Sequence, residues 1–146
     1  MLDLPVGSVM DDKKVLVAPP EMSVIDAAAL MAKQNVGAVM VVEKESLVGI
    51  FTERDAVFRV IAKGCDVRTT LLREVMTVSP FTVDPDTAFG VALLVMHERG
   101  FRHVPVVSEG KPVGIVSARN ALDPDLEEFT FETNRRKHYR AQTMKE

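Results

Sequence analysis

The sequence contains no tryptophan, one tyrosine and one cysteine among its 146 residues. Since 47% of the residues are nevertheless hydrophobic, the core must be built mainly from aliphatic side chains. Cys65 has no second cysteine with which to form an internal disulfide, and the cysteine and histidine residues show no metal-ligand spacing. We therefore expect neither a disulfide framework nor a metal site.

Long apolar runs and a strong net charge are also absent. No stretch of about 18 consecutive apolar residues would span a membrane, and the N-terminal residues lack the basic segment and apolar core of a signal peptide. The formal net charge of −3 gives no sign of a general nucleic-acid-binding protein. These features favour a soluble, cytoplasmic protein with a hydrophobic core and no membrane partner.

The most informative feature that is present is an internal repeat. A shift of 65 residues aligns residues 20–57 with residues 85–122 without a gap. Identical pairs include Pro20 with Pro85, Ala27 with Ala92, Met31 with Met96, and Gly49 with Gly114. An ungapped match of this length indicates two copies of one structural unit.

Each copy predicts the same order of elements, namely strand, helix, strand, strand and helix. In the first copy these elements are expected at residues 15–17, 24–34, 39–42, 47–51 and 53–62, with Ser23 as the cap of the first helix. In the second copy they are expected at residues 81–83, 89–99, 104–107, 112–116 and 118–122. Because a unit of about 60 residues buries little apolar surface alone, we expect the copies to pack through their sheets about a pseudo-twofold axis, leaving two equivalent clefts.

The third strand of each copy leads into a corner with the pattern G-x-x-[T/S]-x-x-[D/N]. It reads Gly49-Ile50-Phe51-Thr52-Glu53-Arg54-Asp55 in the first copy and Gly114-Ile115-Val116-Ser117-Ala118-Arg119-Asn120 in the second. The hydroxyl can cap the helix that follows, and free backbone N–H groups there suit a phosphate. Since Asp55 lies on the same face of the first turn, the corner could hold the ribose and phosphate of a nucleotide. A plain helix cap is the alternative for one corner alone, and the duplication favours a site.

This pattern resembles the CBS domain, a β-α-β-β-α module found in tandem pairs called Bateman modules. The resemblance rests on the two units, the two corners and the run Gly100-Phe101-Arg102-His103-Val104-Pro105-Val106-Val107, and it covers residues 6–122. It implies an α/β (α+β) fold with one repeat at residues 6–65 and a second at 72–122. Residues 123–146 lie outside the resemblance, and their own composition predicts a charged, helical tail. It also implies clefts for adenine nucleotides or related molecules, dimerisation of pairs into a flat disc, and a regulatory role.

Carried over residue by residue, the resemblance gives two unequal clefts. The better-equipped cleft would combine Thr52 for phosphate and Asp55 for ribose hydroxyls with Arg102 and His103 of the second repeat. Arginine suits bidentate phosphate binding. A solvated loop end is the alternative for Arg102 and His103.

The second and weaker cleft would combine Ser117 and Asn120 with Gly37 and Ala38, which carry no charge. An asparagine amide can still bond a ribose hydroxyl, but it donates as well as accepts. This cleft should bind weakly, bind an uncharged part of a ligand, or stay empty.

Several further residues are assigned to the clefts with an alternative role. An apolar slot for the base could be formed by Val17, Ala18, Val39 and Ile50, for each of which core packing is the more common role. Arg54 belongs to the first cleft and Arg119 to the second, unless they form surface ion pairs of little worth.

We therefore expect a stand-alone regulatory module that binds AMP, ATP, NAD(H) or S-adenosylmethionine and then changes its contacts with an unidentified regulated protein. A homodimer is expected, no cofactor is required, and nucleic acid is not an expected partner. The alternatives are a ligand-free dimerisation scaffold and, less favoured, an enzyme acting on a nucleotide. Against an enzyme, His97, His103 and His138 lie far apart in sequence, and no nucleophile–base set is visible.

The tail is expected to form a solvated helix, since acidic residues precede basic ones along it. Docking through Phe129 and Phe131 is the second interpretation. Nucleic-acid contact through the basic run at residues 134–140 is the third and weakest.

Overall fold

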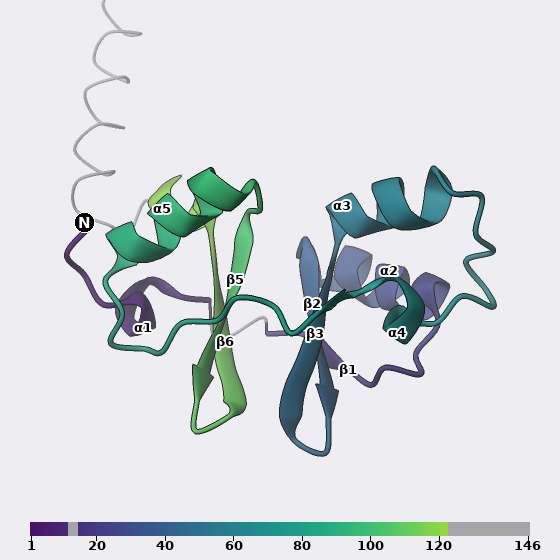
Figure 1. The fold of residues 1–146 in the computed structure, drawn as a ribbon, viewed down its shortest axis with the longest axis horizontal. Helices are drawn as coiled ribbons and strands as arrows, with labels where there is room; N and C mark the ends of the chain where they lie inside the picture. Colours follow the sequence, from purple (N-terminus) through teal and green to yellow (C-terminus); the bar gives the residue numbers. More distant parts are fainter. Residues whose placement is uncertain (12–14, 123–146) are drawn as a thin grey trace, which may run out of the picture.

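A computed structural model describes residues 1–11 and 15–122 of the chain (Figure 1). The predictions made for the tail at residues 123–146, including those for Phe129 and Phe131, lie outside the described residues. Within the described ranges, no helix is long and apolar enough to cross a membrane.

The larger sheet contains four strands in the order β1, β2, β3 and β4. These are β1 (Val17–Ala18), β2 (Ala38–Glu43), β3 (Ser46–Thr52) and β4 (Thr77–Val78). β1 pairs with β2 in parallel, and β2–β3 and β3–β4 are antiparallel pairs. The sheet is accompanied by α2 (Val24–Gln34), α3 (Glu53–Asp55), the π-helix η1 (Ala56–Ile61) and α4 (Leu72–Val75).

Most expected elements of the first copy are present, with two differences. Helix α2 covers the predicted range, and Ser23 caps it by accepting a hydrogen bond of 3.3 Å from the Asp26 N–H. The first strand lies at Val17–Ala18 instead of residues 15–17. The closing helix, expected at residues 53–62, is one α-helical turn followed by a π-helix.

The second copy forms a two-stranded sheet of β5 (His103–Ser108) and β6 (Lys111–Ser117), with α5 (Phe89–Arg99) and the 3-10 helix η2 (Ala118–Leu122). The strand expected at residues 81–83 is reduced to a single parallel bridge between Val83 and Val106. In the first copy the Met40 N–H donates to the Leu16 carbonyl. Its counterpart here is Pro105, which has no N–H to donate.

The core of each half is completed by a short helix that precedes the other repeat in the sequence. Helix α1 (Val6–Val9) places Val6 and Val9 in the core of the second copy. Helix α4 places Leu72 and Val75 in the core of the first copy. Figure 1 shows α1 beside α5, β5 and β6, and α4 beside the larger sheet. One half of the structure therefore contains residues 15–78, and the other contains residues 1–11 together with residues 81–122.

The residues just before α1 and α4 also accept hydrogen bonds from the first N–H groups of the long helices α5 and α2. In α5 the Phe89 and Gly90 N–H groups donate to the carbonyls of Leu4 and Leu2, at 2.8 and 2.9 Å. Helix α2 uses the carbonyls of residues 67 and 70 in the same way. These bonds replace the side-chain cap that α5 lacks.

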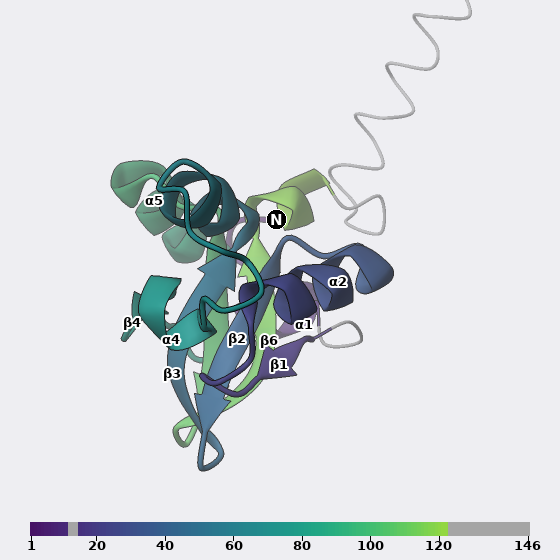
Figure 2. The ribbon, with the colours of Figure 1, turned by 90° about the vertical axis from the view of Figure 1, so that its right-hand side faces the viewer.

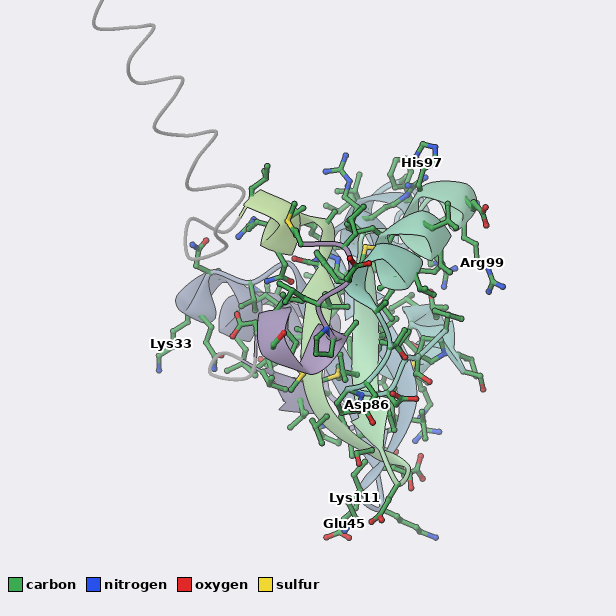
Figure 3. The ribbon with its side chains drawn as sticks, turned by 90° about the vertical axis from the view of Figure 1, so that its left-hand side faces the viewer. Lys33, Glu45, Asp86, His97, Arg99 and Lys111 are labelled. Atoms are coloured by element: carbon green, nitrogen blue, oxygen red, sulfur yellow. The ribbon has the colours of Figure 1, made fainter. Side chains whose placement is uncertain are left out.

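The two halves meet through their sheets, as predicted. β3 of one half contacts β6 of the other, and Figure 2 shows the larger sheet standing in front of the β5–β6 hairpin. At the far end of the hairpins, Lys111 Nζ lies 3.5 Å from Glu45 Oε2 (Figure 3). The structure thus consists of two β-α-β-β-α repeats joined about a pseudo-twofold axis.

Candidate functional site

The corner of the first repeat is closed by hydrogen bonds between Thr52 and Asp55. The Thr52 N–H donates to Asp55 Oδ2 at 2.9 Å, and the Thr52 hydroxyl lies 3.2 Å from the same oxygen. In return, the Asp55 N–H donates to Thr52 Oγ1 at 3.3 Å. The corner is therefore a capping box, as the simpler interpretation of the sequence required.

The second oxygen of Asp55 remains outside the capping box. It lies 3.5 Å from Nε of Arg59, whose Nη1 donates to the carbonyls of Val75 and Met76 at 3.3 and 3.0 Å. Asp55 is only 9% exposed. A partly buried carboxylate oxygen held in this way can accept hydrogen bonds from hydroxyl groups of a ligand.

The corner of the second repeat has the same geometry with a different chemical result. The Ser117 N–H donates to Asn120 Oδ1 at 2.7 Å, and the Ser117 hydroxyl lies 3.4 Å from that oxygen. Because Oδ1 serves the corner, the Asn120 NH₂ group takes the place of Asp55 Oδ1. The first corner thus presents an acceptor, and the second presents a donor.

A cavity of about 800 Å³ adjoins the first corner. It brings together six of the predicted residues, namely Ile50, Thr52, Arg54, Asp55, Arg102 and His103. The corner comes from the first repeat and the basic residues come from the start of β5, so both repeats contribute to the cavity, as the sequence predicted.

A second cavity, of about 430 Å³, adjoins the second corner. Its walls include all five residues predicted for that cleft, namely Gly37, Ala38, Ser117, Arg119 and Asn120. They also include Arg102 and His103, which were expected to serve the first cleft alone. Arg102 and His103 thus border both cavities, whereas their counterparts Gly37 and Ala38 border only the second.

Three of the four residues predicted for the base slot line neither cavity. Ala18 and Val39 are 3% and 0% exposed in the core of the first half, and Val17 lies on β1 with 50% of its surface exposed. The first cavity is lined instead by Phe81 and Phe101 of the second half, among other residues. The internal repeat relates Phe81 to a residue of the other cavity, because Phe81 is the counterpart of Leu16, which lines the second cavity.

Arg54 connects the two repeats across the first cavity. Its Nη1 donates to the Gly100 carbonyl at 3.0 Å, and its guanidinium lies 5.2 Å from the centre of the Phe58 ring. Arg99, which the sequence did not single out, stacks over Phe81 at 5.1 Å and lines the same cavity. Both arginines therefore hold cationic groups at a wall rich in aromatic rings.

The charged groups between the two cavities lie against Gly37. A Cβ atom on Gly37 would lie 2.9 Å from Glu53 Oε1 and 3.3 Å from His103 Nε2. Burial lowers the pKa of His103 below its ordinary value of 6.5; Glu53 raises it, and Arg119 and Arg102 lower it further. The imidazole is thus held toward its neutral form, and Arg102 is the fixed cation of this group.

A model of the CBS domain family matches residues 6–62 and 72–125 of the chain. The meiotically up-regulated gene 70 protein of Schizosaccharomyces pombe is 44% identical over 114 residues, which are 70% of this chain and 16% of that protein. An uncharacterized protein of Methanopyrus kandleri, MK0525, is 32% identical over 112 residues, 75% of this chain and 57% of its own length. The chain therefore spans less than two thirds of either relative. The CBS domain-containing protein YhcV of Bacillus subtilis is 35% identical over 104 residues, 71% of this chain and 74% of its own.

Solved structures show the same fold. An uncharacterized conserved protein from Pyrococcus horikoshii superposes with a TM-score of 0.77 at 31% identity, over 84% of this chain and 92% of that one. The CBS domain pair of protein MJ0100, in complex with 5′-methylthioadenosine and S-adenosyl-L-methionine, gives 0.72 at 25% identity over 80% and 91%. A CBS domain protein from Pyrobaculum aerophilum, complexed with AMP, gives 0.76 at 22% identity over 88% and 97%, a likeness of fold alone. Since the family model matches both repeats and most of the chain, the protein belongs to the CBS domain family and carries a tandem pair of these domains.

Proposed function

We propose that this CBS domain pair is a regulatory module that binds an adenosine-containing ligand with at least one phosphate, such as AMP, ATP or NAD(H). The observation that carries the proposal is the first cavity, where the Thr52–Asp55 corner faces Arg102 and His103. Its volume of about 800 Å³ lies within the range usual for small-molecule sites.

Each part of such a ligand has a matching group in the cavity. Asp55 Oδ1, which also faces Arg59, accepts from a ribose hydroxyl, and Arg102 donates to the phosphate. Thr52 joins it when its hydroxyl turns from Asp55 Oδ2 toward the phosphate. Phe81 and Phe101 offer aromatic surface for the base. Several cationic groups favour a phosphate-bearing ligand over S-adenosylmethionine, whose sulfonium is positive.

The regulatory part of the proposal rests on where the walls come from. A ligand in the first cavity contacts both repeats at once, so it favours the arrangement of repeats that fits it best. Helices η1 and α5 lie on one side of the molecule (Figure 1) and expose the apolar residues Val57, Phe58, Ile61, Val91 and Leu94. We place a homodimer contact on this side, next to the cavity that Phe58 lines.

A ligand-free scaffold is the second candidate. It is favoured by the geometry of the corners, because Asp55 and Asn120 satisfy the Thr52 and Ser117 N–H groups without a ligand. The scaffold would keep the dimer contact and lose the response to nucleotides.

The test is thermal unfolding of wild type and Asp55→Asn with AMP, ATP, NAD and S-adenosylmethionine. The asparagine variant should fold normally, because Asn120 already closes the equivalent corner. A ligand present at about 100 times its Kd stabilises by roughly 2.7 kcal/mol, and about 1 kcal/mol shifts the Tm of a chain of this size by roughly 2–4 °C. AMP should raise the Tm of wild type by several degrees and that of Asp55→Asn by less.

Asp26→Asn is the matched control, since Asp26 is exposed on α2 and lines neither cavity. It should respond to AMP as wild type does. An equal AMP shift in all three proteins would place the ligand away from the first corner. If no nucleotide shifts wild type, the scaffold becomes the better description.

A further inference from the structure

The two cavities meet at a small group of charged residues near the pseudo-twofold axis. Glu53, Arg102 and His103 line both cavities, and we call these three residues the central cluster. Because each cavity reaches the cluster from its own corner, a phosphate bound in either one would lie next to the same three side chains.

Glu53 breaks the symmetry of this arrangement. Its counterpart in the second repeat is Ala118, so the pair has one carboxylate at a position where the other repeat has a methyl group. The backbone around the two residues is equivalent, since the Glu53 N–H donates to the Gly37 carbonyl and the Ala118 N–H donates to the Arg102 carbonyl, both at 3.0 Å. The carboxylate is therefore not needed to build the corner.

The carboxylate has room at the axis because residue 37 is glycine. The site of a Cβ on Gly37 lies 2.9 Å from Glu53 Oε1, so a larger side chain there would displace the carboxylate. Glu53 consequently lies at the boundary between the cavities, where its negative charge acts on His103 against the positive charge of Arg102.

We propose that Glu53 is a specificity-determining residue that limits the phosphate charge which the central cluster accepts. This inference rests on the proposed function, because it concerns ligands of the same cavities. One phosphate is attracted by Arg102 and by the arginine next to each corner, Arg54 or Arg119. Every additional phosphate brings more negative charge toward the Glu53 carboxylate. Since Glu53 and Arg102 are both exposed, this repulsion is moderate and is screened by salt. The pair therefore takes nucleoside monophosphates in preference to triphosphates.

The experiment measures the Kd of AMP, ATP and adenosine by isothermal titration calorimetry, without magnesium, for wild type, Glu53→Ala and Glu53→Gln. Removal of the carboxylate should tighten AMP by about threefold, which corresponds to roughly 0.7 kcal/mol, the size expected for exposed charges. It should tighten ATP by more than AMP and leave adenosine unchanged. Glu53→Gln keeps the size of the side chain and should behave as Glu53→Ala does, since the charge is what matters.

Glu43→Ala is the matched control, because Glu43 is exposed at the end of β2 and lines neither cavity. It should leave all three Kd values at those of wild type. A melting curve of each free variant verifies folding before titration.

The possible failures separate the two proposals. If AMP binds wild type but the ratio of the AMP and ATP Kd values is the same in Glu53→Ala, the role of Glu53 is refuted and the proposed function stands. Weaker AMP binding in both Glu53 variants would also refute it, because Glu53 would then favour the phosphate. If none of the three ligands binds any of the proteins, the proposed function fails and this inference fails with it.

Discussion

Gly49 and Gly114 offer a direct test of how tightly Met76, after α4, and Met10, after α1, pack against the two repeats. A Cβ atom on Gly49 would lie 2.4 Å from Met76 Sδ and 3.0 Å from the Thr77 carbonyl oxygen. The Thr77 carbonyl belongs to β4, and β4 pairs with β3 at Gly49 itself. An alanine at position 49 must therefore move backbone as well as a side chain, whereas at Gly114 the three nearest atoms all belong to the flexible Met10 side chain.

The two substitutions should differ in cost for this reason. Overpacking a well-packed site costs about 1–3 kcal/mol, and we assign Gly49→Ala to the upper part of that range. For a chain of this size the Tm would fall by roughly 4–12 °C. Gly114→Ala should cost less, because Met10 can rotate away from the added methyl group.

Calorimetric melting of both variants measures the difference. The double variant Gly49→Ala/Met76→Ala should be more stable than the sum of its single variants predicts, since the contact with Sδ is then absent. A Gly49→Ala protein that melts with wild type would refute the reasoning. So would a Gly114→Ala protein that loses as much stability as Gly49→Ala.

Two further predictions concern Arg59 and His103. Arg59→Ala should lower the free energy of unfolding by about 1–2 kcal/mol, mainly through the lost bonds to the Val75 and Met76 carbonyls, since its half-exposed ion pair with Asp55 contributes little. Urea denaturation measures this loss, and an unchanged midpoint would show that Arg59 does not hold α4. Because the pKa of His103 is below 6.5 in the fold, its contribution to stability is present above pH 6.5 and is lost as the pH falls through the lowered value. Wild type should therefore lose more stability on acidification than His103→Gln, and equal losses in urea titrations would contradict the burial of a neutral imidazole.

Much of the fold could be predicted because the two copies are similar in sequence and each corner motif is short. Helix α2 and the β2–β3 hairpin follow from local patterns, and the capping of α3 by Thr52, with Asp55 bonding back to the Thr52 N–H, follows from their spacing. The meeting of the first corner with Arg102 and His103 also followed from treating the two copies as partners. The roles of all these residues in ligand binding remain predictions.

The parts that could not be predicted depend on which half a segment joins. Met10 and Met76 are recognisably equivalent in sequence, and the structure places each against a corner glycine, Gly114 and Gly49 respectively. Equivalence alone does not tell that Met10 lies on the second repeat and not on the first, because both repeats offer the same glycine. The presence of Phe81 in the first cavity could not be predicted for the same reason, since this residue belongs to the other half.

The exchange of α1 and α4 between the halves has a consequence for how the chain is made. Residues 15–78 contain all the parts of one half and can fold together as soon as they leave the ribosome. Val6 and Val9 are synthesised well before their partners Phe89, Val104 and Val116, so these apolar side chains stay exposed on the nascent chain until the second half is made. A gene cut between the two sequence repeats would therefore yield two fragments, each of which carries a piece of the other's core and lacks a piece of its own.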